Sequence, residues 1–132
     1  MTAATILVIE DDEASRMLVT YLLETAGYAV HAAENGAVGL QLALSCPHDL
    51  IVCDLQMPIL NGYQVAQTLR SHPNWRAVPL VAVTAFSMPG DREKALEMGF
   101  DEHLSKPITP ETFVGQIAAF LRVSPAAPRG GG

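Results

Sequence analysis

The run Leu50-Ile51-Val52-Cys53-Asp54 is the clearest strand in this sequence: four apolar residues end in a carboxylate and are followed at once by Leu55-Gln56-Met57-Pro58. A short apolar run bounded by turn residues is typical of a buried strand, so we place Asp54 at a strand's end, where a loop begins. A second such run, Thr5-Ile6-Leu7-Val8-Ile9, ends in Glu10-Asp11-Asp12. Acidic side chains therefore follow two predicted strands.

Apolar runs alternate along the chain with segments of helical period. We expect strands at residues 5–10, 28–33, 49–54, 80–84 and 103–105, and helices at 13–26, 36–45, 62–71, 88–98 and 110–122. Turn and cap signals separate them, among them Gly27, Asn35-Gly36, Ser87 as an N-cap, and Thr109-Pro110. This strict alternation predicts a three-layer α/β sandwich, with a parallel sheet between two layers of helices.

The order of the strands follows from how apolar they are. The first, third and fourth are the most uniformly apolar and should be central, which gives the order 2-1-3-4-5. The topological switch point then falls between the first and third strands, and open parallel sheets bind ligands at the carboxyl ends beside such a point. Glu10 and Asp11 should therefore meet Asp54 there, with Thr84 and Lys106 at the ends of two further strands.

Composition limits the class of protein. The 132 residues suit one domain, 1–123, followed by a flexible tail or linker stub at 124–132, and 49% of the residues are hydrophobic. A net charge of -6 without a Lys/Arg run argues against direct nucleic-acid binding. No stretch approaches the roughly 20 apolar residues that span a bilayer, and the N-terminus lacks the basic start and small-residue cleavage site that are typical of a signal peptide. Cys46 and Cys53 have neither metal nor redox spacing, so we expect a cytoplasmic protein without a membrane partner.

Four motifs, each at a predicted strand end, are together specific to one family. They are Ile6-Leu7-Val8-Ile9-Glu10-Asp11-Asp12, Asp54-Leu55-Gln56-Met57-Pro58 with Asn61-Gly62, Val83-Thr84-Ala85, and Lys106-Pro107-Ile108. Over about residues 5–122 the chain resembles the receiver domain of bacterial two-component response regulators, the group that includes the chemotaxis receiver and has a flavodoxin-like fold.

The resemblance implies a role for each acidic residue. Asp54 matches the phosphoacceptor, and Glu10 with Asp11 matches the acidic pair that holds Mg²⁺, although Asp11 with Asp12 also fits that pair. Asp54 itself and the backbone carbonyl of Gln56 complete the expected set of metal ligands. Clustered carboxylates with open positions suit Mg²⁺, which keeps several waters and binds substrate phosphate.

Other matched positions imply the switch. Thr84 and Lys106 correspond to the switch hydroxyl and the lysine of the family, in which the Lys-Pro bond is often cis. His103 stands where most relatives have an aromatic residue that moves inward on activation, so we expect it to act as the second switch residue. Phe86 and Gln56 fall at the rim of the site, where Phe86 should hinder the hydrolytic water.

The resemblance implies a signalling protein rather than an enzyme that turns over a substrate. A receiver assists only its own phosphorylation and dephosphorylation. Asp54 would take the group from a phosphohistidine on a histidine kinase or phosphotransfer protein, in a phosphorelay. A downstream protein would bind the face formed by the fourth helix, fifth strand and fifth helix. Met17, Leu18 and Tyr21 make the first helix apolar beyond one stripe, which fits either kinase docking or burial by neighbouring helices.

Two alternatives remain beside a stand-alone regulator. We expect a stand-alone single-domain regulator, and the first alternative is a receiver module excised from a hybrid histidine kinase or larger regulator. From another class, an aspartyl-phosphate phosphatase that depends on Mg²⁺ also uses an Asp at a strand end. The haloacid-dehalogenase type of phosphatase needs a second acid two residues further on, where this chain has Gln56.

Overall fold

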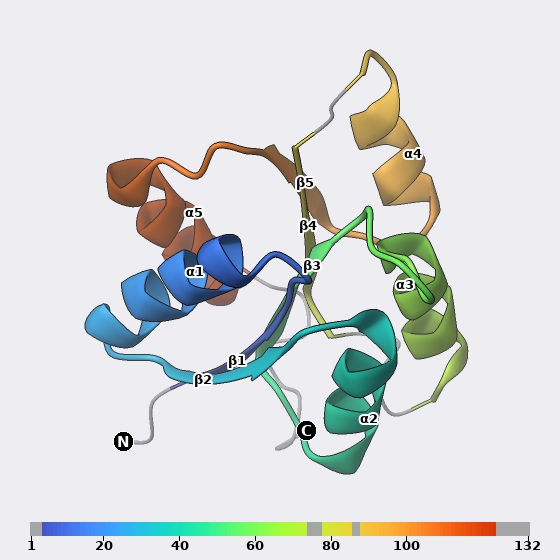
Figure 1. Ribbon diagram of the computed structural model, residues 1–132, viewed down its shortest axis with the longest axis horizontal. Coiled ribbons are helices and arrows are strands. Elements are labelled where there is room, and N and C mark those ends of the chain that lie inside the picture. Colours follow the sequence, from blue (N-terminus) through green and yellow to red (C-terminus); the bar gives the residue numbers. More distant parts are fainter. Residues whose placement is uncertain (1–3, 74–77, 86–87, 124–132) are drawn as a thin grey trace.

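The computed structural model describes residues 4–73, 78–85 and 88–123, and the expected rim residue Phe86 and the expected tail 124–132 lie outside these ranges. The described residues form a five-stranded parallel sheet with five helices (Figure 1). In chain order the elements are β1 Thr5–Ile9, α1 Glu13–Thr25, β2 Ala29–Ala33, α2 Gly36–Ser45, β3 Leu50–Asp54, α3 Gly62–Ser71, β4 Leu80–Thr84, α4 Asp91–Glu97, β5 Glu102–Ser105 and α5 Pro110–Val123.

The sheet separates two helical layers, as the alternation of elements predicts. Helices α1 and α5 cover one face, and α2, α3 and α4 cover the other (Figure 1). Successive side chains of a strand point to opposite faces, so Leu7 and Ile9 of β1 pack under α2 and α3 while Ile6 and Val8 pack under α1 and α5. Strands β1, β3 and β4 are buried on both sides because they lie at the centre of the sheet.

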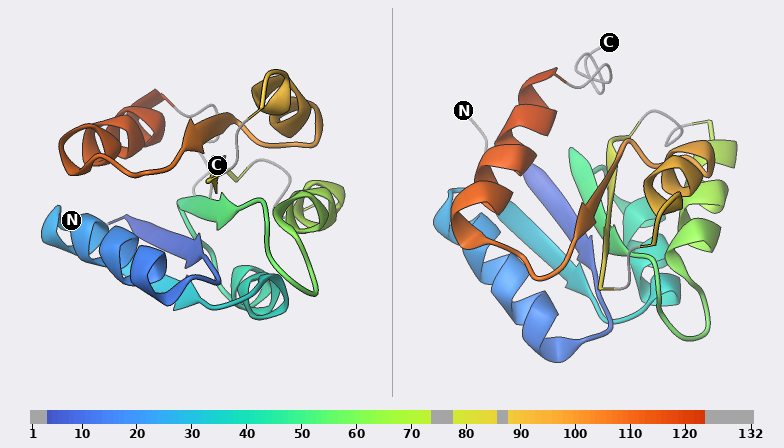
Figure 2. Two further views of the ribbon diagram at one scale, coloured as in Figure 1. Left: turned by 45° about the horizontal axis from the view of Figure 1, so that its top comes forward. Right: turned by 90° about the horizontal axis from the view of Figure 1, so that it is seen from above.

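The strand order is β2-β1-β3-β4-β5, which confirms the predicted order and the switch point between β1 and β3. All five strands run the same way, so their carboxyl ends lie along one edge (Figure 2). Ile9 pairs with Cys53, which brings the residues just after them together, and Thr84 pairs with Ser105. The acids and Lys106 therefore reach the same edge from distant parts of the chain.

Helix α4 is shorter than predicted. The sequence pattern indicates residues 88–98 with Ser87 as N-cap, but the helix spans Asp91–Glu97 and its N-cap is Gly90, with φ 93°. The Met88 N–H donates to the Asp91 carboxylate at 2.7 Å, and the Asp91 N–H donates to the Met88 carbonyl at 3.0 Å. A turn closed by Asp91 thus replaces the first helical turn; Ser87 lies outside the described residues.

Local capping fixes the loop beyond β3. Asn61 accepts from the Gln64 N–H at 3.0 Å, and the Gln64 side chain accepts from the Asn61 N–H at 2.8 Å, which is a complete capping box. At Gly62 a Cβ atom would lie 2.5 Å from the Asp54 carbonyl oxygen. Glycine here lets the start of α3 approach the backbone that supports Asp54.

Arg70 joins the opposite end of α3 to its neighbours. Its guanidinium donates to the carbonyls of Gly99 at 2.7 Å and Val78 at 2.6 Å, and pairs with Asp101 at 3.0 Å. Asp101 in turn accepts from the Leu80 N–H at 2.8 Å. This half-buried side chain therefore ties α3 to the starts of β4 and β5. Within the described ranges, no helix has the length and apolar character to cross a membrane.

Candidate functional site

The site lies where β1 and β3 end. Glu10, directly after β1, is 4% exposed, and Asp54, the last residue of β3, is 6% exposed, whereas Asp11 is exposed to solvent. One carboxylate oxygen from each of these three residues lies within 4.8 Å of the other two. The fold therefore brings together the three acids that the sequence analysis selected.

Lys106 reaches this cluster from the end of β5. Its Nζ lies 2.6 Å from Glu10 Oε1 and 3.2 Å from Asp54 Oδ2. The backbone places it there: the Lys106 N–H donates to the Thr84 carbonyl at 2.9 Å, and the Lys106–Pro107 peptide bond is cis. One ammonium group thus lies between the two buried carboxylates.

Backbone N–H groups hold the remaining carboxylate oxygens. The Asp12 N–H donates to Glu10 Oε2 at 3.1 Å, and the Gln56 N–H donates to Asp54 Oδ1 at 3.0 Å. Arg16, one turn into α1, donates to the Glu10 carbonyl at 3.0 Å. Both buried acids therefore have fixed orientations, and Gln56 contributes to this through its own backbone.

The carboxylates of the site lie close enough to repel one another, and this affects the pKa values of Glu10 and Lys106. Burial and the nearby Asp54 together raise the pKa of Glu10 from 4.5 to about 7, against the lowering effect of Lys106 and of the Asp12 N–H. Burial by itself would lower the pKa of Lys106, but its hydrogen bond to Glu10 and the negative charges of Asp54 and Glu10 raise it. A cation is therefore favoured here, because it offsets the repulsion between the acids.

Asp12 has a different role from its two acidic neighbours. Its carboxylate is the N-cap of α1 and accepts from the Ser15 N–H at 2.9 Å. Hydrogen bonds from Ser15 lower the pKa of Asp12. Of the two possible acidic pairs, Glu10 with Asp11 is the one whose oxygens gather around Asp54.

The expected switch residues lie on neighbouring strands. Thr84 ends β4 and is 1% exposed, next to Ser105 in the register. His103 is half-buried on β5, and its Nε2 is enclosed without a hydrogen-bond partner among the described residues. Its backbone N–H donates to the Glu102 carboxylate at 2.9 Å.

The donor set fits a hard divalent cation. Carboxylate oxygens at a solvent-facing edge, with Asp11 exposed, match Mg²⁺, which keeps several waters and dehydrates reluctantly. The same arrangement presents a buried carboxylate, Asp54, beside an ammonium group. These groups suit acceptance of a phosphoryl group, which depends mainly on positioning and charge neutralisation.

Comparison with known proteins agrees with this geometry. A model of the response regulator receiver domain family matches residues 6–118. The chain belongs to this family. The receiver domain is 35% identical over 116 residues to the polar-differentiation response regulator DivK of Brucella anthropi, covering 88% of this chain and 94% of DivK. DivK of Brucella ovis is 34% identical over the same length.

Solved structures share the fold of this receiver domain. The Vibrio cholerae chemotaxis protein CheY4 superposes with a TM-score of 0.84 at 26% identity, covering 89% of this chain and 98% of that one. The receiver domain of the Pseudomonas aeruginosa sensor histidine kinase PA1611, described with a magnesium ion coordinated in its active site cleft, gives 0.80 at 28%, with 93% and 98% covered. The predicted flavodoxin-like α/β fold and the predicted family are thus confirmed.

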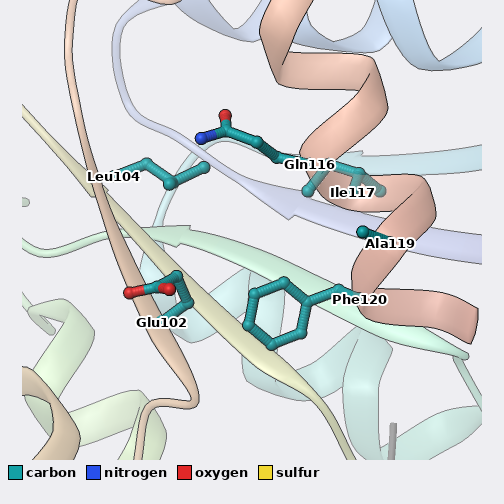
Figure 3. Close-up of a pocket in the computed structure, with 6 residues that line it drawn as sticks. All are labelled: Glu102, Leu104, Gln116, Ile117, Ala119 and Phe120. Atoms are coloured by element: carbon teal, nitrogen blue, oxygen red, sulfur yellow. The ribbon is translucent and has the colours of Figure 1, made fainter. Parts of the chain in front are cut away.

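The receiver domain has a groove of about 260 Å³ between β5 and α5, two of the three elements of the face expected to bind a downstream protein (Figure 3). Its lining residues are Glu102 and Leu104 of β5 and Gln116, Ile117, Ala119 and Phe120 of α5. In Figure 3 the Phe120 ring and the Glu102 carboxylate enclose one end of the groove, and Leu104 lies toward the other. The wall is mostly apolar, with one carboxylate and one amide.

Proposed function

We propose that this receiver domain accepts a phosphoryl group on Asp54 from the phosphohistidine of a histidine kinase or phosphotransfer protein, and that the modification changes which protein it binds. The observation that supports this most directly is the buried Asp54 carboxylate, with Lys106 Nζ at 3.2 Å and the Glu10 and Asp11 oxygens within 4.8 Å. An acid needed only for folding is rarely buried among two other acids.

The transfer requires no general acid or base from the protein. An Asp54 oxygen forms the new bond to phosphorus as the bond from phosphorus to the histidine nitrogen breaks, and that nitrogen keeps the electron pair. Lys106 offsets charge on the incoming oxygens; at about 4 Å and an effective dielectric of 20 this is worth roughly 4 kcal/mol before desolvation. The Gln56 N–H holds Asp54 Oδ1 and limits its rotation.

Glu10, Asp11, Asp54 and the backbone carbonyl of Gln56 are the groups that we propose hold Mg²⁺. When bound, the ion supplies positive charge that draws the acceptor carboxylate and the phosphoryl oxygens together. The acidic cluster supports this assignment, because its ligand oxygens are already gathered and its buried Glu10 has a raised pKa.

The conformational change would follow from the added charge. A phosphoryl group brings about two negative charges and new acceptor oxygens, and Thr84, at the end of β4, carries the hydroxyl of the expected switch. Movement of the Thr84 loop would alter the space available to His103 on the adjacent β5. The two residues would then pass the change from the acidic site to the face formed by α4, β5 and α5.

Two surfaces suit the two protein partners. Met17 and Tyr21 of α1 are 64% and 65% exposed, so neighbouring helices do not bury them. Two other residues of the same helix, Ser15 and Leu18, line a hollow of about 400 Å³ together with Ala85, Lys106, Pro107 and Ile108. We assign this side to the phosphohistidine donor, and the groove between β5 and α5 to the downstream protein (Figure 3).

We favour a stand-alone regulator, because the match extends over 94% of the DivK relative. The PA1611 receiver, part of a sensor histidine kinase, keeps the alternative of a module in a larger protein open. Sequencing the complete reading frame on either side of this chain decides between them.

Phosphorylation with acetyl phosphate and Mg²⁺, followed by intact mass, tests the proposal. We expect one phosphoryl group on the wild type, none on Asp54→Asn, and one on the control Asp12→Asn, whose acid only caps α1. Modification of Asp54→Asn at the wild-type level would exclude Asp54 as the acceptor. Continuous turnover of p-nitrophenyl phosphate would instead support the phosphatase alternative.

A further inference from the structure

A second cluster of metal-ligating side chains lies away from the acidic site, at the β2 side of the sheet. His31 Nδ1 is 2.9 Å from His48 Nε2, and Cys46 Sγ is 3.9 Å from the same nitrogen. One ligand atom from each of the three residues lies within 4.8 Å of the others. His31 belongs to β2, while Cys46 caps the end of α2 and His48 precedes β3, so only the fold brings them together.

The cluster is partly enclosed, as a binding site should be. His48 is 3% exposed, Cys46 is half-buried and His31 is exposed at the edge of the sheet. Burial lowers the pKa of His48, and the charge of His31 lowers it further, while the backbone of Cys46 and the charge of Asp49 act in the opposite direction. The net effect lowers the pKa of His48, which favours the neutral form of imidazole that binds metals.

The distances are close to those of a tetrahedral zinc site. With Zn–N of about 2.0–2.1 Å and Zn–S of about 2.3 Å, two ligand nitrogens lie about 3.3 Å apart and nitrogen lies about 3.6 Å from sulfur. The observed 2.9 Å and 3.9 Å differ from these values by a few tenths of an ångström. The remaining pair, His31 and Cys46, is no more than 4.8 Å apart, so the exposed His31 side chain would have to move by up to about 1 Å to reach the nitrogen–sulfur distance of such a site.

We propose that His31, Cys46 and His48 form a Zn²⁺ site that joins β2 to the segment between α2 and β3. When zinc binds, the proton shared by the two imidazoles moves to the other nitrogen of the donating ring, so both rings stay neutral, and the proton of the Cys46 thiol is released to water. Three protein ligands leave the fourth position to water. Two imidazoles and a thiolate select a softer ion than Mg²⁺, so the site is chemically distinct from the carboxylates around Asp54.

The simplest competing explanation is a hydrogen bond between two neutral imidazoles. Their rings are T-shaped, with centroids 5.1 Å apart and an interplanar angle of 84°, which suits packing as well as ligation. This explanation does not require the Cys46 sulfur beside the same His48 nitrogen. The hydrogen-bond explanation requires no metal, whereas the zinc site requires a metal with the Cys46 sulfur as one of its ligands. Metal binding through sulfur is measurable.

Titration of the purified receiver with Co²⁺, in a phosphine reductant and without oxygen, tests the site. We expect tetrahedral absorption bands and a thiolate-to-cobalt charge-transfer band that saturate at one equivalent and disappear when Zn²⁺ is added. The charge-transfer band should be absent from Cys46→Ser. Cys53 does not offer a rival thiolate, because it is fully buried and burial raises its pKa.

Matched variants separate this site from the acidic one. His31→Asn alters an exposed side chain and should weaken Co²⁺ binding at least tenfold with the fold intact by circular dichroism, while His103→Asn should leave it unchanged. Asp54→Asn should retain the bands. Absence of the charge-transfer band from the folded wild type, its persistence in Cys46→Ser, or its loss in Asp54→Asn would each overturn the proposal, whatever the outcome of phosphorylation at Asp54.

Discussion

Replacing Glu10 by glutamine should stabilise the metal-free protein at pH 8, although it removes an ion pair of 2.6 Å with Lys106. The reason is that burial of the Glu10 carboxylate costs more than the pair returns, which is why its pKa is raised from 4.5 to about 7. The amide keeps the shape of the carboxyl group and has no charge to desolvate. The acidic site is thus a place where folding stability and the proposed function conflict.

The size of the effect follows from the pKa. A carboxyl group whose pKa is higher in the folded state stabilises the protein fully below its unfolded pKa of 4.5, and that contribution is lost as the pH rises through about 7. One pKa unit corresponds to about 1.4 kcal/mol, so the whole effect is about 3 kcal/mol, of which about 2 kcal/mol falls between pH 5.5 and pH 8.

Urea unfolding followed by circular dichroism in a chelating buffer, at half-unit steps of pH from 5.5 to 8, measures this. The free energy of unfolding of Glu10→Gln minus that of the wild type should grow by about 2 kcal/mol across the series. His48, whose pKa is lowered, makes both proteins more stable as the pH rises toward 6.5, and subtraction removes this common contribution. A variant less stable than the wild type at pH 8 would refute the reasoning.

Three further predictions concern docking, a buried cation and a close backbone approach. Tyr21→Ala, at a side chain that is 65% exposed, should slow phosphoryl transfer from the cognate kinase about tenfold but leave labelling by acetyl phosphate unchanged; an equal loss in both assays would contradict a docking role. Arg70→Met orphans two carbonyl groups and should lower the free energy of unfolding by about 3 kcal/mol, with Arg70→Lys in between; a loss below about 1 kcal/mol in urea unfolding would be inconsistent with these hydrogen bonds. Gly62→Ala, with its Cβ 2.5 Å from the Asp54 carbonyl oxygen, should cost about 1–3 kcal/mol and slow labelling of Asp54, whereas the control Gly115→Ala, with no atom within 4 Å, should stabilise by up to about 1 kcal/mol; similar melting temperatures for the two variants would argue against the clash.

The fold followed from local signals. Buried strands such as Leu50–Asp54 are visible as short apolar runs, and the regular alternation with helices leaves one arrangement of layers, because right-handed crossovers place helices on both faces. The boundary that went wrong, the start of α4, depends on a turn closed by the Asp91 side chain, which periodicity does not report.

The acids of the candidate site could also be predicted from the sequence, since they lie at or just after the ends of predicted strands and parallel strands end at one edge of the sheet. The sequence did not decide whether Asp11 or Asp12 belongs to the acidic pair, because that depends on which of the two carboxylates caps α1.

Sequence alone determined the layers, the strand order and the place of Asp54 at the end of a strand, because these depend on hydrophobic periodicity and chain direction, which are properties of neighbouring residues; the acceptor role proposed for Asp54 came from the family resemblance. Only the tertiary structure decided that Lys106 lies between Glu10 and Asp54 and that His31 meets Cys46 and His48. Contacts of this second kind join residues from separate elements, and their distances are set by packing across the whole sheet rather than by any local pattern.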